Sequence, residues 1–138
     1  MAEQGADSPR HEGGCACGAI RYVALSEPIK PHYCHCRTCR RITGAPVSAW
    51  VNFAKSSFAW SAGEPAWYQS SPGMRRGFCG NCGSTLCTLE DDGYVCVAIC
   101  SLDDPAAMAP GYHIYWQHAL PWLSQDDALP REERPDRF

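Results

Sequence analysis

The sequences CACG at residues 15–18 and CGNCG at residues 79–83 decide the fold of this chain. Each contains two cysteines close together, and glycine follows the second cysteine directly. A tight turn can aim two such thiolates at one metal ion, and the glycine lets backbone N–H groups turn toward the sulfurs. We therefore predict one four-thiolate structural site, formed by Cys15, Cys17, Cys79 and Cys82.

Zinc is the metal expected at this site, because it takes four sulfurs in a tetrahedron with bonds of about 2.3 Å. Iron is the main chemical alternative, since a tetrahedron of sulfurs also suits iron. Four buried free thiols are the other alternative, because cysteine packs as a small hydrophobic residue, but they leave the paired spacing unexplained. Metal bound here would close a loop over most of the domain, so its binding free energy would be folding free energy.

A second cysteine group, CHCRTC at residues 34–39, supplies three thiolates from Cys34, Cys36 and Cys39. Zinc with three protein ligands and one open position is typical of a catalytic site. Three thiolates leave the centre with a charge of about −1, which favours a soft sulfur ligand over strongly activated hydroxide. The triplet therefore predicts a second, catalytic zinc ion, with a thiol substrate held there as a thiolate.

Two alternatives remain open for the triplet. Either one sulfur joins a structural site while the others pack, or a fourth protein ligand fills the open position, with His32 and His35 nearest. In an extended segment the His35 side chain points away from both adjacent cysteines, which favours a packing role or a supporting role behind the metal ligands. An exposed triplet also loses metal and oxidises, so an empty second site, or a Cys34–Cys39 or Cys36–Cys39 disulfide, fits the same interpretation.

Arg40 and Arg41 follow the triplet and are candidates to bind a substrate carboxylate, since arginine pairs with carboxylates through two parallel hydrogen bonds. The alternative is a solvated edge, where arginines are common. Trp50 and Phe78 are the aromatic residues we expect to line a pocket beside the triplet.

The remaining cysteines and histidines are expected to be structural. Cys87, Cys96 and Cys100 stand alone in the sequence, and the last two are expected to fill the core from one strand face. His113 and His118 are expected to be hydrogen-bonded structural histidines rather than acid–base groups.

The 138 residues fit one domain with its own core, with an expected flexible arm at 1–12, the domain at 13–130 and a flexible tail at 131–138. No apolar run reaches the roughly 18 residues of a membrane helix, and the first residues do not read as a signal peptide. We therefore expect a cytoplasmic protein, where cysteine pairs bind metal more often than they form disulfides. The formal net charge of −3 argues against nucleic acid as a partner.

Short β-type runs, separated by eleven prolines and twelve glycines, predict a mainly β fold of small antiparallel sheets pinned by zinc. Strands are expected at 19–24, 46–53, 66–69, 74–78, 84–89 and 94–99, with a further one in 113–118. Residues 90–93 end in glycine and predict a hairpin turn. Short helices are expected at 36–42 and 105–109.

Taken in order, these motifs resemble the glutathione-dependent formaldehyde-activating enzyme family, which also contains centromere protein V. The matching stretches are GGCACGAIRY, YCHCRTCRRITGAP, GFCGNCGSTL and HIYWQHALPW, and they cover residues 13 to about 130. The resemblance implies a β-tent fold, with a structural zinc on the four-cysteine set and a catalytic zinc on the triplet. The named activity of the family joins formaldehyde to glutathione, giving S-hydroxymethylglutathione, and is classed as a carbon–sulfur lyase.

We therefore expect a zinc-dependent carbon–sulfur lyase that acts on the aldehyde adduct of glutathione or a similar small thiol. The alternative is a non-enzymatic zinc module that binds a protein partner, as centromere protein V suggests for this fold. An exposed apolar patch away from the triplet, or a fourth protein ligand at the second site, would favour the alternative.

Overall fold

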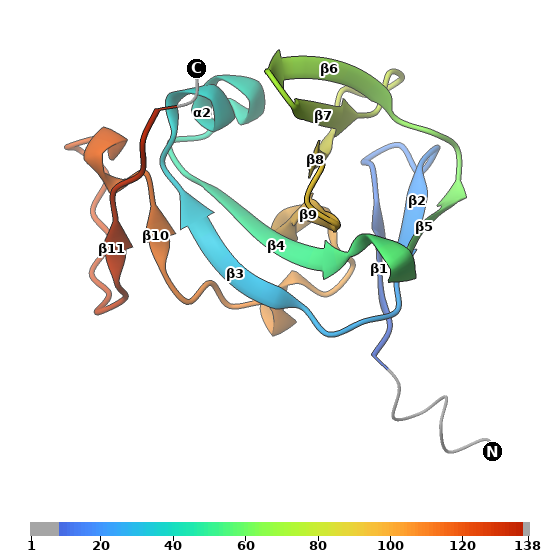
Figure 1. Ribbon diagram of the computed structural model, residues 1–138, viewed down its shortest axis with the longest axis horizontal. Coiled ribbons are helices and arrows are strands. Elements are labelled where there is room, and N and C mark those ends of the chain that lie inside the picture. The colour runs from blue at the N-terminus through green and yellow to red at the C-terminus, as the bar shows by residue number, and fades with distance from the viewer. Residues whose placement is uncertain (1–8, 137–138) are drawn as a thin grey trace.

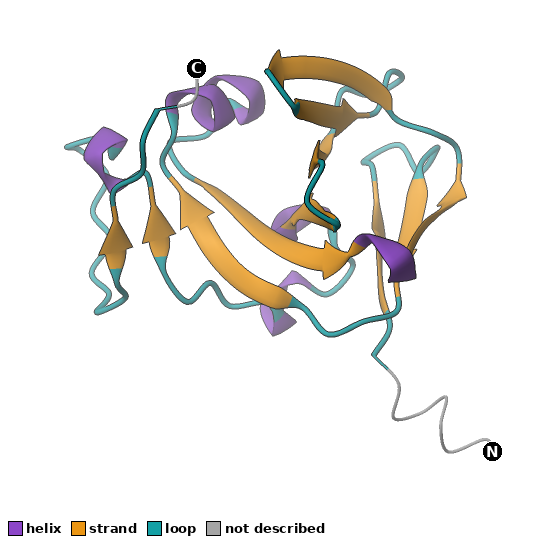
Figure 2. Cartoon of the chain, viewed as in Figure 1, coloured by secondary structure: helices purple, strands orange, loops and turns teal. Residues whose placement is uncertain are grey.

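The computed structural model describes residues 9–136, and most of its regular structure is β-strand (Figure 2). The strands are β1 (His11–Gly14), β2 (Arg21–Ala24), β3 (Ile29–Cys34), β4 (Ser48–Ala54), β5 (Phe58–Ala62), β6 (Ala66–Ser71), β7 (Met74–Phe78), β8 (Thr85–Glu90), β9 (Tyr94–Ala98), β10 (His113–Ile114) and β11 (Arg131–Glu132). In this part of the chain α2 (Arg37–Thr43) is the one α-helix. The remaining helical elements are short 3₁₀ helices: η1 (Lys55–Ser57), η2 (Ile99–Ser101), η3 (Pro105–Ala107) and η4 (Trp116–His118). The mainly β fold class is confirmed.

The strands form two sheets, and in Figure 1 β1, β2 and β5 lie together at one end of the molecule. One is small and antiparallel, in the order β1-β2-β5, and the other has eight strands in the order β11-β10-β3-β4-β9-β8-β7-β6. The larger sheet is mixed, because β10 runs parallel to both β3 and β11. The expectation of small antiparallel sheets is therefore corrected for this sheet. Parallel pairing joins segments that are distant in sequence, so local patterns do not reveal it.

Six strands lie close to their expected positions. β7 has the expected bounds, and β2, β4, β6, β8 and β9 differ from theirs by one or two residues at an end. The β8–β9 hairpin turns where expected, with Gly93 at a positive φ of 83° and the Tyr94 N–H donating to Asp92 Oδ1. Gly93 suits this turn because glycine has no Cβ to clash there.

The strands that the sequence pattern missed are irregular or short. In β3 the register with β4 shifts between Ile29 and His32, and Lys30 takes a positive φ of 50° just before Pro31. A proline beside a bulge hides a strand from pattern analysis. Residues 113–118 give only the two-residue β10, because Tyr115 adopts a left-handed conformation and η4 follows it.

Parts of the expected flexible ends belong to the fold. Residues 1–8 lie outside the described residues, but His11 and Glu12 pair with β2 through β1. At the other end, Arg131 and Glu132 form β11 beside β10. The domain therefore extends beyond the expected limits of 13 and 130.

Strand β4 separates two clusters of buried side chains. Val51 and Phe53 belong to the larger cluster, which also contains Tyr22, Leu86 and Val97. Trp50, which alternation places on the opposite face of the strand, belongs to a smaller cluster that contains the three cysteines of the triplet. The fold thus places the triplet on the face of β4 away from the main core.

Candidate metal centres

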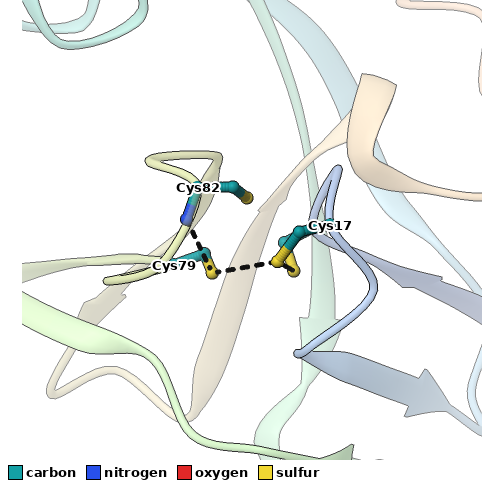
Figure 3. A group of neighbouring side chains, drawn as sticks. Cys17, Cys79 and Cys82 are labelled. Atoms are coloured by element: carbon teal, nitrogen blue, oxygen red, sulfur yellow. Dashed lines mark hydrogen bonds between the residues drawn. The ribbon is translucent and has the colours of Figure 1, made fainter.

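The four paired cysteines meet at one point, although 62 residues separate Cys17 from Cys79. Their sulfurs all lie within 4.8 Å of one another. Cys15 Sγ and Cys17 Sγ are 3.6 Å apart, and Cys17 Sγ and Cys79 Sγ are 3.8 Å apart. Tetrahedral zinc with bonds of about 2.3 Å has sulfur–sulfur edges of about 3.8 Å. The arrangement therefore fits a four-sulfur metal site, and Figure 3 shows the two cysteine turns facing each other.

Each cysteine pair lies on a tight turn that ends in glycine. Gly18 and Gly83 have φ values of 82° and 81°, and their N–H groups donate to the carbonyl oxygens of Cys15 and Cys79. The same turns aim further N–H groups at sulfur: Ile20 N lies 3.2 Å from Cys15 Sγ, and Asn81 N and Cys82 N lie 3.4 Å from Cys79 Sγ. Such bonds stabilise thiolates and orient them for a metal.

Ser84 joins the two turns. Its hydroxyl oxygen accepts from Ala16 N at 2.9 Å and lies 3.1 Å from Cys82 Sγ. Hydrogen bonding from Ser84 lowers the pKa of Cys82 to about 5, so its thiolate is available for metal at neutral pH. Cys17 and Cys82 are exposed whereas Cys15 and Cys79 are buried, so this cluster lies at the surface.

The triplet forms a second, more deeply buried cluster. Cys34 ends β3, Cys36 is the N-cap of α2 and Cys39 lies in the first turn of α2, with exposures of 5%, 1% and 5%. Cys34 Sγ and Cys39 Sγ are 3.6 Å apart without a disulfide, and Cys39 N donates to Cys36 Sγ at 3.2 Å. One strand end and one helix start thus bring three sulfurs within metal-binding range of one another.

The three sulfurs line a cavity of about 240 Å³. Its walls come from six strands of the larger sheet and from α2, so the sheet curves around it. Trp50 and Tyr115 are buried beside the sulfurs, while Asp92 and Tyr94 are the exposed part of the lining. The cavity is smaller than the roughly 300–1,000 Å³ that encloses a whole small molecule, so it suits one end of a ligand.

Arg76 lies against the triplet, a position that the spacing of the cysteine motifs does not predict. It is 3% exposed and lines the cavity from β7, with Nη1 donating to Cys39 Sγ at 3.4 Å. Hydrogen bonds from Cys34 and Cys36, and then the charge of Arg76, lower the pKa of Cys39 to about 2. Hydrogen bonds with Cys36 and Cys39, together with burial, raise the pKa of Cys34. In the sequence, Arg76 lies two residues after Met74 in an expected strand, so the two side chains share one face. This spacing was the available sign that Arg76 is buried.

Comparison with known proteins identifies the family. A model of the glutathione-dependent formaldehyde-activating enzyme family matches residues 10–118. The chain belongs to this family.

One sequence relative and one solved structure are also similar to this chain. An uncharacterized lyase of Schizosaccharomyces pombe is 40% identical over 78 residues, which are 56% of this chain and 56% of the relative. This chain thus spans about half the length of that curated relative. The crystal structure of a Rhodobacter sphaeroides protein aligns over 87% of this chain and 98% of that one, with a TM-score of 0.55 and 18% identity. That likeness supports the fold alone.

The other residues predicted for the site of this formaldehyde-activating family member are distributed differently. Trp50 lines the cavity as expected, but Phe78 is not part of the lining. Arg40 and Arg41 lie on the last turn of α2, where Arg40 donates to the His118 carbonyl and Arg41 is exposed. Neither lines the cavity, whereas Arg76 and Arg134 do.

Among the isolated cysteines, Cys87 is buried in the core, whereas Cys96, which was expected in the core, lies on the cavity wall. The core role expected for Cys100 is corrected, because η2 begins one residue earlier and leaves Cys100 exposed. None of the three joins a cysteine cluster in the part of the chain that the structure describes.

A chain of hydrogen-bonded polar groups, which runs from the buried His35 and His113 to the exposed Asp127, supports the segment that holds Cys34 and Cys36. His113 Nε2 lies 3.1 Å from both Asp127 carboxylate oxygens, and His113 Nδ1 lies 2.9 Å from His35 Nε2. Burial and the neighbouring His113 lower the pKa of His35 to about 4, so the ring is neutral at pH 7. With His113 donating Nε2–H to Asp127, its Nδ1 accepts from His35 Nε2–H. His35 thus has the packing role expected of it.

His32 and His118 make separate contacts. His32 lines the cavity, and its Nδ1–H donates to the Lys30 carbonyl at 2.8 Å, while burial lowers its pKa. His118 contacts Asp136 at 2.7 Å near the surface. Neither histidine groups with the three sulfurs as a metal ligand in residues 9–136.

The donor sets fit the metal that the family implies. Four sulfurs with supporting N–H groups match a closed site, and three sulfurs facing a cavity match a site with an open position. Within residues 9–136 no helix is long and apolar enough to span a bilayer.

Proposed function

We propose that this protein is a zinc-dependent carbon–sulfur lyase that forms or cleaves the adduct between a small thiol, such as glutathione, and an aldehyde. Cys34, Cys36 and Cys39 would hold the catalytic ion, and Cys15, Cys17, Cys79 and Cys82 the structural one. The membership of the formaldehyde-activating family and the relative named as a lyase support this class of reaction. We also propose that the protein acts in the cytoplasm, because both clusters need reduced thiols and the cytoplasm keeps thiols reduced.

The observation that carries the proposal is the difference between the two clusters. The triplet has three sulfurs on a cavity and, among the described residues, no fourth histidine, cysteine or carboxylate close enough to complete it. The other cluster has four sulfurs and is complete. An open position beside a cavity is the arrangement that lets a substrate reach a metal.

The reaction is an addition and its reverse. A thiolate sulfur adds to the aldehyde carbon, the C–S bond forms, and the carbonyl π pair moves to oxygen, which takes up a proton. Cleavage returns that proton and the electron pair in the opposite direction. A zinc ion with three thiolate ligands supplies stabilisation of the substrate thiolate at neutral pH.

The protein's own residues provide the environment for this chemistry. Trp50 and Tyr115 pack against the triplet and keep that side of the cavity apolar, which excludes water from the reactive sulfur. The Trp50 ring is fixed because Nε1–H donates to Ser48 Oγ at 2.7 Å. Arg134 and Asp92 place charges of both signs on the lining, which suits the charged end of an amino-acid-like thiol.

The non-enzymatic alternative rests on different features. A fourth protein ligand at the second site would favour it, and the described residues supply none. Trp122 is 70% exposed and is the kind of residue that a protein partner would cover, but it is a single side chain. We therefore place the lyase first.

Adduct formation between formaldehyde and glutathione tests the function directly. We expect the zinc-loaded protein to accelerate exchange between free and hydroxymethylated glutathione, measured by exchange NMR. Cys36→Ser should reduce the rate by about 100-fold or more while the fold persists, because it removes a ligand of the open site. Cys100→Ser is the matched control, since Cys100 is exposed and outside both clusters.

Two results would contradict the proposal. One is the absence of rate acceleration in wild-type protein that carries two zinc ions, with formaldehyde and with other small aldehydes. The other is full activity in Cys36→Ser with its single remaining ion.

A further inference from the structure

We propose that the positive charge of Arg76 balances the negative charge of the three-thiolate metal centre. We further propose that it favours binding of a thiolate at the open position of this centre. This inference rests on the proposed function only in that the triplet binds a divalent metal. Nothing in the family match or the relatives assigns a role to this residue.

The contacts of Arg76 are unusual for a buried arginine. Its hydrogen bonds go to Cys39 Sγ at 3.4 Å, to Ser70 Oγ at 3.0 Å and to Met74 Sδ at 3.8 Å. These acceptors are two sulfurs and a hydroxyl rather than a carboxylate. A buried cation is costly unless an opposite charge lies close to it. The charge of Arg76 is therefore directed at the sulfur cluster.

The charges of the two partners complement each other. A divalent ion with three thiolates carries a net charge of about −1, and Arg76 adds +1, so the assembly is neutral. Cys34, Cys36 and Cys39 are 5%, 1% and 5% exposed, and Arg76 is 3% exposed. Because water reaches neither partner well, each reduces the desolvation cost of the other.

The four-cysteine cluster provides a contrast within the same molecule. It would carry a charge of about −2 with zinc, yet its described contacts are N–H groups, the Asn81 amide and the Ser84 hydroxyl. Cys17 and Cys82 are exposed, so water can solvate this charge. An arginine is needed only where the metal centre is buried.

The same charge selects the ligand at the open position. An anionic fourth ligand raises the negative charge of the centre, and a guanidinium in contact with Cys39 offsets part of that cost. A neutral ligand such as water gains no comparable benefit. Arg76 therefore favours a thiolate, and binding of small thiols should weaken when its charge is removed.

The main test compares Arg76→Gln with Arg75→Gln. Arg75 is the adjacent residue of β7 and is exposed, with its guanidinium 4.8 Å from the Trp67 ring centroid, so its loss changes the net charge equally. Zinc affinity is measured for each ion by competition with a chelating dye. In protein loaded with cobalt(II), absorption spectroscopy measures the thiolate-to-metal charge-transfer band. The change of this band on addition of 2-mercaptoethanol measures thiol binding. A Cys34→Ser, Cys36→Ser double variant lacks two ligands of the triplet, so the zinc affinity that it retains is that of the four-cysteine cluster.

We expect Arg76→Gln to weaken zinc binding at the triplet by about 10- to 100-fold, with binding at the four-cysteine cluster unchanged. In Arg76→Gln the 2-mercaptoethanol concentration that gives half of the change in the cobalt band should rise by at least about tenfold. Arg75→Gln should match wild type in both measurements. Equal affinities at the triplet in Arg76→Gln and wild type would overturn the inference, while leaving the lyase proposal untouched.

Arg76→Lys keeps the inference testable if Arg76→Gln does not fold. Lysine retains the charge but not the planar fork, so a counter-charge role predicts triplet affinity within about threefold of wild type. A loss as large as that expected for glutamine would show that shape rather than charge matters, and would overturn the inference. Because both readouts are metal and thiol binding, an absence of lyase turnover does not affect them.

Discussion

At the scale of single residues, the ten cysteines fall into environments that predict different reactivity. Cys100 is exposed on η2, whereas burial raises the pKa of Cys87 to about 12 and keeps it a neutral thiol at ordinary pH. The thiolate is the reactive form of cysteine. Exposure and ionisation together therefore separate these two side chains, although both are isolated in the sequence.

Alkylation of zinc-loaded protein checks this difference. Iodoacetamide at pH 8 should modify Cys100 first and leave Cys87 unmodified, as measured by mass spectrometry of digested protein. The Cys100→Ser variant should remove the fast phase and nothing else. Modification of Cys87 at the same rate as Cys100 would show that the core opens far more readily than its burial implies.

The sequence predicted those site residues whose role follows from spacing alone. Both cysteine clusters assemble as expected, because two or three ligands of each lie within one turn of chain. Arg76 was missed because nothing in its own segment shows that β7 faces α2. Arg40 and Arg41 were chosen by proximity in sequence, but the helix carries them to its last turn, away from the sulfurs.

At the scale of elements, the support of the triplet comes from β10 and the loop after η4. Asp127 accepts from His113 of β10 and from Arg131 Nη1 at 2.7 Å, and His113 in turn contacts His35. Arg131 also stacks on Trp116, with its guanidinium carbon 4.7 Å from the ring centroid. This group ties the C-terminal strands to the loop that holds Cys34 and Cys36.

Replacing the carboxylate of this group gives an element-scale prediction. Asp127→Asn should lower the midpoint of urea unfolding, because hydrogen bonds to a charged acceptor are lost at His113 and Arg131. Urea unfolding of the metal-loaded protein measures the change. Asp126→Asn removes the same charge from the adjacent exposed residue and should have almost no effect. Equal stabilities of the two variants would refute the role of Asp127.

Strand prediction succeeded for the hairpin strands and failed for several strands that pair with distant parts of the chain. The hairpin strands β7, β8 and β9 pair with their sequence neighbours, so local alternation and turn residues were sufficient. β3 contains a register shift and a proline, and β10 and β11 have only two residues each. Those three depend on partners elsewhere in the chain, which a local pattern does not contain.

At the scale of the whole molecule, the core contains acidic groups that must stay protonated. Burial raises the pKa of Tyr22, and it raises the pKa of Cys87 from an ordinary value of 9.0 to about 12. In the unfolded chain such a thiol loses its proton near pH 9, while in the folded protein it retains the proton. Stability from Cys87 is therefore complete below about pH 9 and is lost as pH rises toward 12.

Thermal unfolding of metal-loaded protein between pH 7 and pH 11 tests whether stability falls as the pH rises. The melting temperature of the wild type should decline progressively above about pH 9, the ordinary pKa of the buried thiol. In Cys87→Ala the melting temperature should be lower at pH 7, because a cavity is created, but it should decline less steeply above pH 9. Parallel declines in the two proteins would exclude Cys87 as a source of the alkaline instability.

The order of the cysteines along the chain has a consequence for biosynthesis. Cys34, Cys36 and Cys39 lie within six residues, whereas the other cluster needs Cys17 and Cys82 together. As the polypeptide leaves the ribosome, a complete set of three thiolates emerges before Cys79 and Cys82, the partners of Cys15 and Cys17. A nascent chain can therefore bind its first ion at the triplet, whereas the site that joins the two distant segments is complete only after Cys82 has emerged.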